Sequence, residues 1–427
     1  MVIRIFEPLK RSTHSSFNQP MPDPALHPRH AAPLLREALA DSPVVLVHGP
    51  PPVRQDHADR MVGEPLGYAY ISFDDDTMRA AAEADPVGFA EGLPKRVILD
   101  EVQRLPALFT TVKHAVDRER APGRFLLTGS ANVLLLPKLA DSMAQCELAD
   151  QPGTFLERLF VADFMTRHGG RRAGPQLIEA IAAGGYPAAL ARTSARRRAA
   201  WYRDYIDALV QRDVRDLSRI HSLDALPRLL AVAATQTAQL FNASDLAATF
   251  QLSRPTIADY VTLLERVFLL ERLPPWHSNR MSRLVKTPKL HLGDTGLACA
   301  LLGVDAQALA GDRTLLSHLL ETFVFQELRR QESWSDMDAA FFHYRDREGV
   351  EVDVVIERGA HALAGVEIKA AASVTSRDFR GLAKLRDTLA KRFTAGVVLY
   401  DGETALGFGD RLFAVPIREL VGESSAR

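Results

Sequence analysis

Residues 97–101 read VILDE, an apolar run that ends in two carboxylic acids, and this stretch decides the fold class. It has the form of a Walker B segment, a buried strand whose terminal acids lie beside a nucleotide. Earlier in the chain, residues 43–50 read PVVLVHGP, an apolar strand followed by the glycine that opens a phosphate-binding loop. Residues 67–75 (GYAYISFDD) and 124–132 (RFLLTGSAN) add two more short apolar runs, with helix-length polar segments between the runs. This alternation predicts an α/β fold, a parallel sheet with crossover helices.

The acids of the Walker B segment carry the predicted chemistry of this domain. Asp100 is the candidate magnesium ligand, and Glu101 is the candidate for polarising the attacking water. Ser130 or Asn132, at the end of the last apolar run, is a candidate sensor of the γ-phosphate. The alternative interpretation is that Asp100 and Glu101 only end a strand and cap a helix. The order and spacing of the apolar runs favour descent from a nucleotide-binding ATPase.

The phosphate-binding loop departs from its usual pattern, G-x-x-x-x-G-K-[ST]. From Gly49 the chain reads GPPPVRQD. Arg54 therefore stands in place of the second glycine, Gln55 in place of the lysine and Asp56 in place of the hydroxyl residue. The prolines at positions 50–52 have no backbone N–H to donate to a phosphate. Gly49 remains as the candidate phosphate contact, and we expect nucleotide binding to be impaired.

The composition indicates an ordinary globular protein. Of the 427 residues, 47% are hydrophobic and 25% are charged, and the formal net charge is -1. This balance gives no overall attraction to nucleic acid, so DNA binding requires a local patch. Cys146 and Cys299 form no metal-ligand spacing, and we expect buried apolar roles for them. The sequence shows neither a long apolar run nor a signal-peptide core, which predicts a cytoplasmic chain without membrane contact.

The chain is predicted to have a tail and three folded parts. Residues 1–30 are polar and contain several prolines, so we expect a flexible tail. Residues 31–165 hold the predicted parallel sheet with the phosphate loop, and residues 166–300 form a helical and winged-helix region. Residues 301–427 read as helix, strand, strand, helix and strand, which predicts a further α/β domain.

The winged helix is predicted from residues 242–273, NASDLAATFQLSRPTIADYVTLLERVFLLERL. Ser253 is the expected cap of the second helix, and Pro255 lies in its first turn, where a missing N–H costs nothing. The apolar face of this helix leaves four side chains exposed where a recognition helix would meet the major groove. These are Arg254, Thr256, Asp259 and Tyr260, of which Arg254, Thr256 and Tyr260 are the candidate DNA contacts. The alternative is a winged helix that serves only packing or protein contact.

Two neighbouring predicted strands near the C-terminus carry acids. In residues 350–357 (VEVDVVIE) alternation places Val350, Val352, Val354 and Ile356 on one face and Glu351 and Asp353 on the other. Residues 365–370 (GVEIKA) place Glu367 and Lys369 together on the next strand. An acid followed by E-x-K on the adjacent strand is the PD-(D/E)xK nuclease arrangement.

In that arrangement Asp353 and Glu367 are the candidate metal ligands, and Lys369 is the candidate catalytic group that stabilises charge or activates water. Glu321 or Glu327, on the preceding predicted helix, is a further candidate ligand. The alternative is a solvated strand face with alternating charges.

In these segments the chain resembles the bacterial and archaeal AAA-type ATPases that carry a C-terminal DUF4143 domain. The resemblance rests on segments that occur in one order: VVLVHGP, ILDEVQRLP, RFLLTGS, GGYP, YIDALVQRDVRDL, HLGDTGLACALLG, LETFVFQELRR, and VEVDVVIE with VEIKAA. It implies an AAA-type domain that binds ATP and magnesium, then a winged helix, then a nuclease-like domain. The biological role of the family is poorly defined, so the resemblance supplies no substrate.

The chain departs from this family after the third apolar run as well as in the loop. Family members continue through a Leu-Ala-Gly-Arg segment and another strand, whereas residues 136–142 read LPKLADS and lack that arginine. Three functions remain open: a DNA-associated AAA-family ATP-binding protein with impaired nucleotide binding, a metal-dependent nuclease or DNA-structure-binding protein, and a non-enzymatic relic or interaction scaffold. The candidate partners are DNA, another protein or a second copy of the chain.

Overall fold

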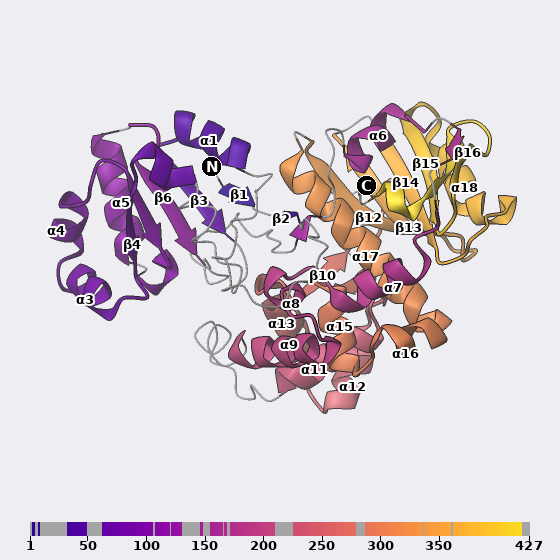
Figure 1. The fold of residues 1–427 in the computed structure, drawn as a ribbon, viewed down its shortest axis with the longest axis horizontal. Coiled ribbons are helices and arrows are strands. Elements are labelled where there is room, and N and C mark those ends of the chain that lie inside the picture. The colour runs from indigo at the N-terminus through magenta and orange to yellow at the C-terminus, as the bar shows by residue number, and fades with distance from the viewer. Residues whose placement is uncertain are drawn as a thin grey trace, which may run out of the picture. The chain divides into compact units, whose positions relative to one another are not determined.

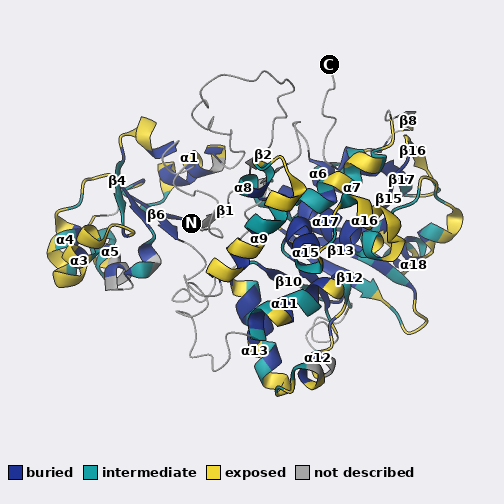
Figure 2. Ribbon diagram, turned by 60° about the horizontal axis from the view of Figure 1, so that its bottom comes forward, coloured by how far each residue is buried: buried dark blue, intermediate teal, exposed yellow. Residues whose placement is uncertain are grey.

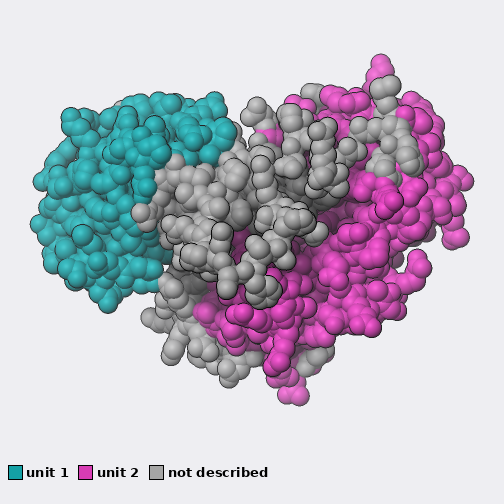
Figure 3. Space-filling view, viewed as in Figure 1, with its two compact units in different colours: residues 1–146, 213–219, 266–268 teal, residues 147–212, 220–265, 269–427 magenta. Residues whose placement is uncertain are grey.

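The computed structural model describes residues 2–4, 7–8, 32–48, 62–105, 107–119, 121–129, 146–147, 154–164, 166–168, 171–209, 225–278, 287–335, 337–359 and 362–420. The chain divides into two compact units, coloured separately in Figure 3. Unit 1 comprises Met1–Cys146, Asp213–Arg219 and Arg266–Phe268. Unit 2 comprises Glu147–Arg212, Ile220–Glu265 and Leu269–Arg427.

Unit 1 is built on a parallel five-stranded sheet in the order β1-β3-β6-β5-β4 (Figure 1). Its strands are β1 (Val2–Arg4), β3 (Val44–His48), β4 (Ala69–Ser72), β5 (Val97–Asp100) and β6 (Phe125–Gly129). Strands β3 to β6 are the four apolar runs from which the parallel sheet was predicted. Every residue of β5 and β6 is buried, as expected for parallel strands covered on both faces.

Helices cover both faces of this sheet. They are α1 (Ala32–Asp41), α3 (Asp76–Ala84), α4 (Pro86–Glu91) and α5 (Ala107–Arg118). One core cluster joins Leu35 of α1 to Ile98 of β5, and a second joins Leu108 of α5 to Leu99 of β5. Because successive residues of a strand face opposite sides, the two clusters lie on opposite faces. Figure 2 shows α3 and α4 mostly exposed on the outside of this unit.

The N-terminal segment differs from the predicted flexible tail. Strand β1 pairs in parallel with β3, the strand that precedes the phosphate-binding loop. Strand β2 (Glu7–Pro8) pairs with β7 (Cys146–Glu147). Strands of two or three residues are too short to produce a periodicity signal, so no pattern in the sequence predicts them.

Unit 2 opens its middle region with a group of helices. They are α7 (Gly174–Ala183), α8 (Pro187–Leu190), α9 (Ala195–Leu209), α11 (Ala225–Thr235), α15 (Thr295–Leu302) and α16 (Ala306–Gly311). The buried Asp294 caps α15 by accepting the N–H of Leu297 at 2.7 Å, and it also accepts the N–H of Gly185 at 2.7 Å. Gly184 takes a φ of 73° before that contact, a conformation that favours glycine. The GGYP and GDTGL segments are therefore tied together by one carboxylate.

The predicted helix pair of the middle region is present. Strand β9 (Gln239–Leu240) is followed by α12 (Ala243–Phe250), α13 (Arg254–Arg266), β10 (Leu270–Leu273) and β11 (Lys289–Leu292). The three strands form an antiparallel sheet in the order β10-β11-β9. Ser253 caps α13 as predicted, because its Oγ accepts the N–H of Thr256 at 3.2 Å. The expected inner face of α13 is fully buried at Ile257, Val261 and Leu264.

The C-terminal region has a mixed seven-stranded sheet in the order β12-β13-β14-β15-β17-β16-β8. Along the chain it runs through β8 (Arg167–His168), α17 (Arg313–Trp334), β12 (Ala339–Arg345), β13 (Glu351–Arg358), β14 (Ala362–Lys369), α18 (Arg380–Leu389), β15 (Phe393–Tyr400), β16 (Thr404–Gly407) and β17 (Leu412–Pro416). Strand β13 is antiparallel to both of its neighbours, β12 and β14, whereas β14, β15 and β17 are parallel. Both faces of β13 are buried, since Val354, Val355 and Ile356 have no exposed surface.

The boundary between the units differs from the predicted one at residue 165. Helix α6 (Phe155–Val161) belongs to unit 2, and its Leu156 N–H donates to Oε1 of Gln331 on α17 at 3.1 Å. The regions 166–300 and 301–427 also form one compact unit rather than two. Among the helices that the structure describes, none has the length and apolarity needed to span a membrane.

Candidate functional sites

The Walker B acid Asp100 lies at the carboxyl end of β5 and is almost completely buried. Its Oδ2 accepts hydrogen bonds from the Tyr70 hydroxyl at 2.7 Å and the Ser72 hydroxyl at 2.8 Å, both from β4. Its Oδ1 accepts a hydrogen bond from the Thr128 hydroxyl of β6. Three hydroxyl groups from the two flanking strands therefore hold the carboxylate at the edge of the sheet where open α/β folds bind their ligands.

Glu101 follows directly and takes a φ of 56°, in the left-handed region. This conformation costs a residue with a side chain roughly 1–2 kcal/mol, and such strain gathers at functional sites. The role of Glu101 in polarising a water stays a prediction. Gly49, Ser130 and Asn132, the other predicted members of this site, lie outside the described residues, as does the loop that contains Arg54, Gln55 and Asp56.

The oxygen-rich surroundings of Asp100 fit a hard cation. Carboxylate and hydroxyl oxygens are the ligands that Mg²⁺ takes up in nucleotide sites, and Ser72 and Thr128 place hydroxyls on either side of Asp100. With magnesium bound, the ion would neutralise phosphate charge there.

The C-terminal acids meet where two strands separate. The antiparallel ladder between β13 and β14 ends at the pair Val354–Val366. One residue beyond it, Oδ2 of Asp353 accepts the backbone N–H of Ile368 at 2.9 Å. Glu367 precedes Ile368 and would be the next partner of Asp353 in this register. The predicted convergence of Asp353 and Glu367 is thus supported by the strand pairing.

The predicted strict alternation along β13 is wrong. The register of β13 against β12 shifts between Phe342 and Tyr344, and Val352 and Val355 pack in the same core cluster. Strict alternation would place these two residues on opposite faces. The shift is an irregularity of the bulge type, which re-aims side chains beside a strand end. Asp353 lies within it.

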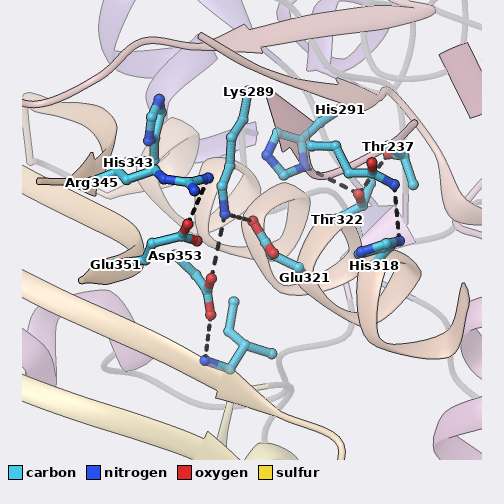
Figure 4. A network of polar contacts seen from close by, with 12 residues as sticks. Thr237, Lys289, His291, His318, Glu321, Thr322, His343, Arg345, Glu351 and Asp353 are labelled. Carbon is cyan, nitrogen blue, oxygen red and sulfur yellow. Dashed lines mark hydrogen bonds and ion pairs between the residues drawn. The ribbon is translucent and has the colours of Figure 1, made fainter. Parts of the chain in front are cut away.

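A lysine from another part of the chain lies between two of the acids (Figure 4). Nζ of Lys289, on β11, is 2.6 Å from Oε1 of Glu321 on α17 and 3.4 Å from Oδ1 of Asp353. The side chains of Lys289, Glu321 and Asp353 are 7%, 11% and 13% exposed. The acids therefore do not form a solvated strand face, and they are held by an internal cation.

Glu367 forms its own ion pair in the same cluster. Nζ of Lys369 donates to Oε1 of Glu367 at 2.7 Å, while Oε2 of Glu367 is buried without a hydrogen-bond partner among the described residues. Burial, followed by the charge of Asp353, raises the pKa of Glu367 to about 8. Burial and Asp353 also raise the pKa of Glu321. The charge of Asp353 thus acts on both Glu321 and Glu367.

A second polar chain lies near Lys289 and starts beside Glu321, at the next residue of α17 (Figure 4). Nδ1 of His291 lies 3.1 Å from Oγ1 of Thr322, and that hydroxyl lies 2.8 Å from Oγ1 of Thr237 (Figure 4). Burial, followed by the positive charge of Lys289, lowers the pKa of His291 well below its ordinary value. His343 is affected in the same way, and its pKa falls to about 4. Both imidazoles are therefore neutral at pH 7.

Two predicted site residues take other roles. Glu327, the alternative to Glu321, is fully buried and pairs with Arg330 at 2.7 Å one turn along α17. Glu321 is therefore the acid of α17 that joins the cluster. Tyr260 was expected to be exposed, but it is only 7% exposed and packs into the protein, so its side chain is not available for DNA. Arg254 is exposed as predicted, and Thr256 is partly exposed.

Lys289 is the residue of this cluster that the sequence prediction missed. The short strand KLHL begins with this lysine and is buried throughout. Because lysine is almost never fully buried unless it is paired, a lysine in such a strand indicates an acidic partner elsewhere in the chain. Among the described residues, no group of three or more His, Cys, Asp or Glu side chains has an arrangement that could hold a metal ion. Of the acids predicted to form a nuclease-like metal site, Glu321 and Asp353 lie around the ammonium group of Lys289.

Comparison with known families and proteins agrees with this architecture. Residues 54–149 match the model of an AAA domain, residues 174–308 match a domain of unknown function named DUF8612, and residues 316–420 match the domain of unknown function DUF4143. Uncharacterized proteins of Mycobacterium bovis and Mycobacterium tuberculosis are each 29% identical over 400 residues, which is 93% of this chain and 85% of the relative. The chain thus combines an AAA domain with a C-terminal DUF4143 domain, as its sequence motifs indicated.

Proposed function

We propose that this chain is an AAA-family protein with a magnesium-nucleotide half-site around Asp100, a weakened grip on the phosphates and a DNA-associated role. The observation that carries the nucleotide part is the Asp100 carboxylate, buried at the carboxyl edge of the parallel sheet and held by hydroxyls of Tyr70, Ser72 and Thr128. Asp100 would hold the ion, and Glu101 would orient the attacking water. The match to the AAA domain model supports this assignment.

The altered loop determines the expected affinity. A loop lysine and several backbone N–H groups normally form charge-assisted hydrogen bonds with the phosphates, each worth about 1.5–3 kcal/mol. The prolines at positions 50–52 and the residues Arg54, Gln55 and Asp56 cannot supply these bonds in the same way. We therefore expect a dissociation constant for Mg-ATP in the millimolar range, since each 1.4 kcal/mol weakens binding tenfold.

Isothermal titration with Mg-ATP tests this proposal, using the native chain beside a variant with a repaired loop. The repaired loop carries Arg54→Gly, Gln55→Lys and Asp56→Thr, and it should bind at least tenfold more tightly. Adding Asp100→Asn to it should remove most of that gain, because the ion loses its ligand. A native dissociation constant below about 10 μM would contradict the impaired loop, and no gain on repair would contradict the nucleotide site.

A DNA-associated role is supported by two features of unit 2. The order β9, α12, α13, β10 and β11, with β11 in the centre of the sheet, supports the proposal of a winged helix, a helix-turn-helix type that reads the major groove. Arg254 lies exposed at the start of its second helix.

The second candidate function, a nuclease-like site, is favoured by the order α17, β12, β13, β14, α18 and β15 with Asp353 on β13 and Glu367 and Lys369 on β14. A supercoiled plasmid incubated with Mg²⁺ or Mn²⁺ tests it: cleavage by the native chain that is lost in Asp353→Ala supports nuclease activity, and uncut plasmid excludes it under those conditions.

A further inference from the structure

One buried ammonium group neutralises acids from two other elements of unit 2. Lys289 belongs to β11, within the region that matches DUF8612. Glu321 and Asp353 belong to α17 and β13, within the region that matches DUF4143. The Lys289 ammonium is thus an element of the middle region that completes a site in the C-terminal region (Figure 4).

Lys289 is the cation that contacts two of the three acids in this cluster. Its Nζ lies between Glu321 and Asp353, and all three side chains are largely buried. Lys369 pairs instead with Glu367 and is partly exposed. The charge of Lys289 therefore faces the acids that would otherwise hold an ion.

The Nζ atom also stands where a shared cation would stand. Its contacts with Oε1 of Glu321 and Oδ1 of Asp353 keep these two oxygens within 6.0 Å of each other, the sum of 2.6 and 3.4 Å. A divalent ion bound by the same two oxygens would need to lie between them at about 2.1 Å from each. The ammonium and the ion would then occupy the same space, and the buried cluster would carry an excess of positive charge.

We propose that the Lys289 ammonium occupies the divalent-cation position of the acid cluster, so that the native chain holds this site closed to metal with its own cation. The inference rests on the nuclease-like arrangement proposed above, but it excludes metal-dependent cleavage at this site by the native chain, so plasmid cleavage that is lost in Asp353→Ala would overturn it. Removal of the ammonium would leave Oε1 of Glu321 and Oδ1 of Asp353 as oxygen ligands for Mg²⁺ or Mn²⁺. Oε2 of Glu367, which has no hydrogen-bond partner among the described residues, would then have to move toward the ion to become a third ligand.

The test compares Mn²⁺ binding by the native chain and by Lys289→Met, a variant of similar side-chain length without charge. Electron paramagnetic resonance of free Mn²⁺ at pH 8 measures the bound fraction. We expect Lys289→Met to gain one site that binds at least tenfold more tightly than any site of the native chain. The matched control is the double variant Lys289→Met with Asp353→Asn. It should lose that site, because it lacks the Asp353 carboxylate as well as the lysine.

Thermal unfolding gives a second readout for a variant that folds poorly. Mn²⁺ should raise the melting temperature of Lys289→Met, since a ligand bound only to the native state stabilises it, and it should leave the native chain unchanged. The inference is overturned when the native chain itself binds one Mn²⁺ that Asp353→Asn abolishes, or when Lys289→Met neither binds Mn²⁺ nor is stabilised by it. A Lys289→Met variant that binds Mn²⁺ without cutting DNA supports the inference and counts against the nuclease candidate.

Discussion

Glu327 and Arg330 lie one turn apart on α17 and form a buried ion pair, with Nη2 of Arg330 2.7 Å from Oε2 of Glu327. Their side chains are 0% and 3% exposed, so neither charge is shared with solvent. Burial raises the pKa of Asp294, which ties α15 to the GGYP turn, and the charge of Arg330 is the weakest of the effects that oppose this rise. One guanidinium group thus pairs with Glu327 and also acts on a buried acid of another element.

Replacing Arg330 with Met is expected to destabilise unit 2 by about 3–5 kcal/mol, because it leaves Glu327 as an uncompensated buried charge. Glu327→Gln should cost less, since Arg330 keeps its interaction with Asp294. Urea unfolding followed by far-ultraviolet circular dichroism, which reports both units, measures both. Arg118→Met is the matched control: Arg118 pairs with Glu91 at 2.7 Å, but both side chains are largely exposed, so the loss should stay below about 1 kcal/mol. Equal losses at positions 118 and 330 would contradict the buried pair.

Glu101→Gly should stabilise unit 1 while weakening any nucleotide hydrolysis. The φ of 56° at Glu101 is strained for a side chain and easy for glycine. The expected gain is about 1 kcal/mol in the free energy of unfolding, measured by urea unfolding. In the repaired-loop background, ATP hydrolysis should fall with little change in Mg-ATP affinity, because Glu101 is proposed to act on the water and not to bind the nucleotide. A lower stability would mean that the Glu101 side chain makes contacts worth more than the strain.

Acid should destabilise unit 2 through its two buried imidazoles. Burial, then Lys289 and, more weakly, Arg345, lowers the pKa of His343 to about 4, against the opposing effects of the Thr287 carbonyl and Asp353. The ordinary histidine pKa is 6.5, so between pH 6.5 and 4 the unfolded chain binds more protons than the native one. The free energy of unfolding then falls as the pH decreases through this window, and it is insensitive to this group above pH 6.5.

His343→Gln removes that titration and keeps a donor for the Thr287 carbonyl, which lies 3.2 Å from Nε2. The variant should lose less stability than the native chain between pH 6.5 and 4, by on the order of 1–3 kcal/mol. Urea unfolding at several pH values measures the difference. His291 contributes in the same direction, so some acid sensitivity should remain. Parallel curves for the two proteins would exclude His343 as a source.

A comparison of substitutions at Arg254 and Tyr260 tests the winged-helix proposal. Arg254→Ala should weaken binding to duplex DNA several-fold at low salt, because one phosphate or base contact is lost. Fluorescence anisotropy with a labelled duplex measures this. Tyr260→Ala should instead lower stability by about 3–5 kcal/mol, the range for deleting a buried aromatic side chain, since Tyr260 is 7% exposed. Unchanged DNA binding in Arg254→Ala, with native stability, would favour the packing role.

Most of the secondary structure could be predicted from local pattern. The apolar runs that form β3, β4, β5 and β6 are short and bounded by polar segments. Such a run predicts a buried strand from its own residues alone. The caps of α13 at Ser253 and the acids at the ends of β5 and β13 follow from the same local information. The short strand β1 carried no such signal, because three residues do not establish a period.

The candidate sites, too, could be predicted in part from local pattern and in part only from the tertiary structure. The sequence by itself determined which acids exist and which elements carry them: Asp100 on a Walker B strand, and Asp353 and Glu367 on neighbouring strands. Only the tertiary structure decided what meets them. Lys289 reaches Glu321 across 32 positions and Asp353 across 64, and Glu327 turned instead to Arg330. The physical reason is that periodicity encodes which face of an element is buried, whereas the partner buried against that face is chosen by packing between elements far apart in the chain.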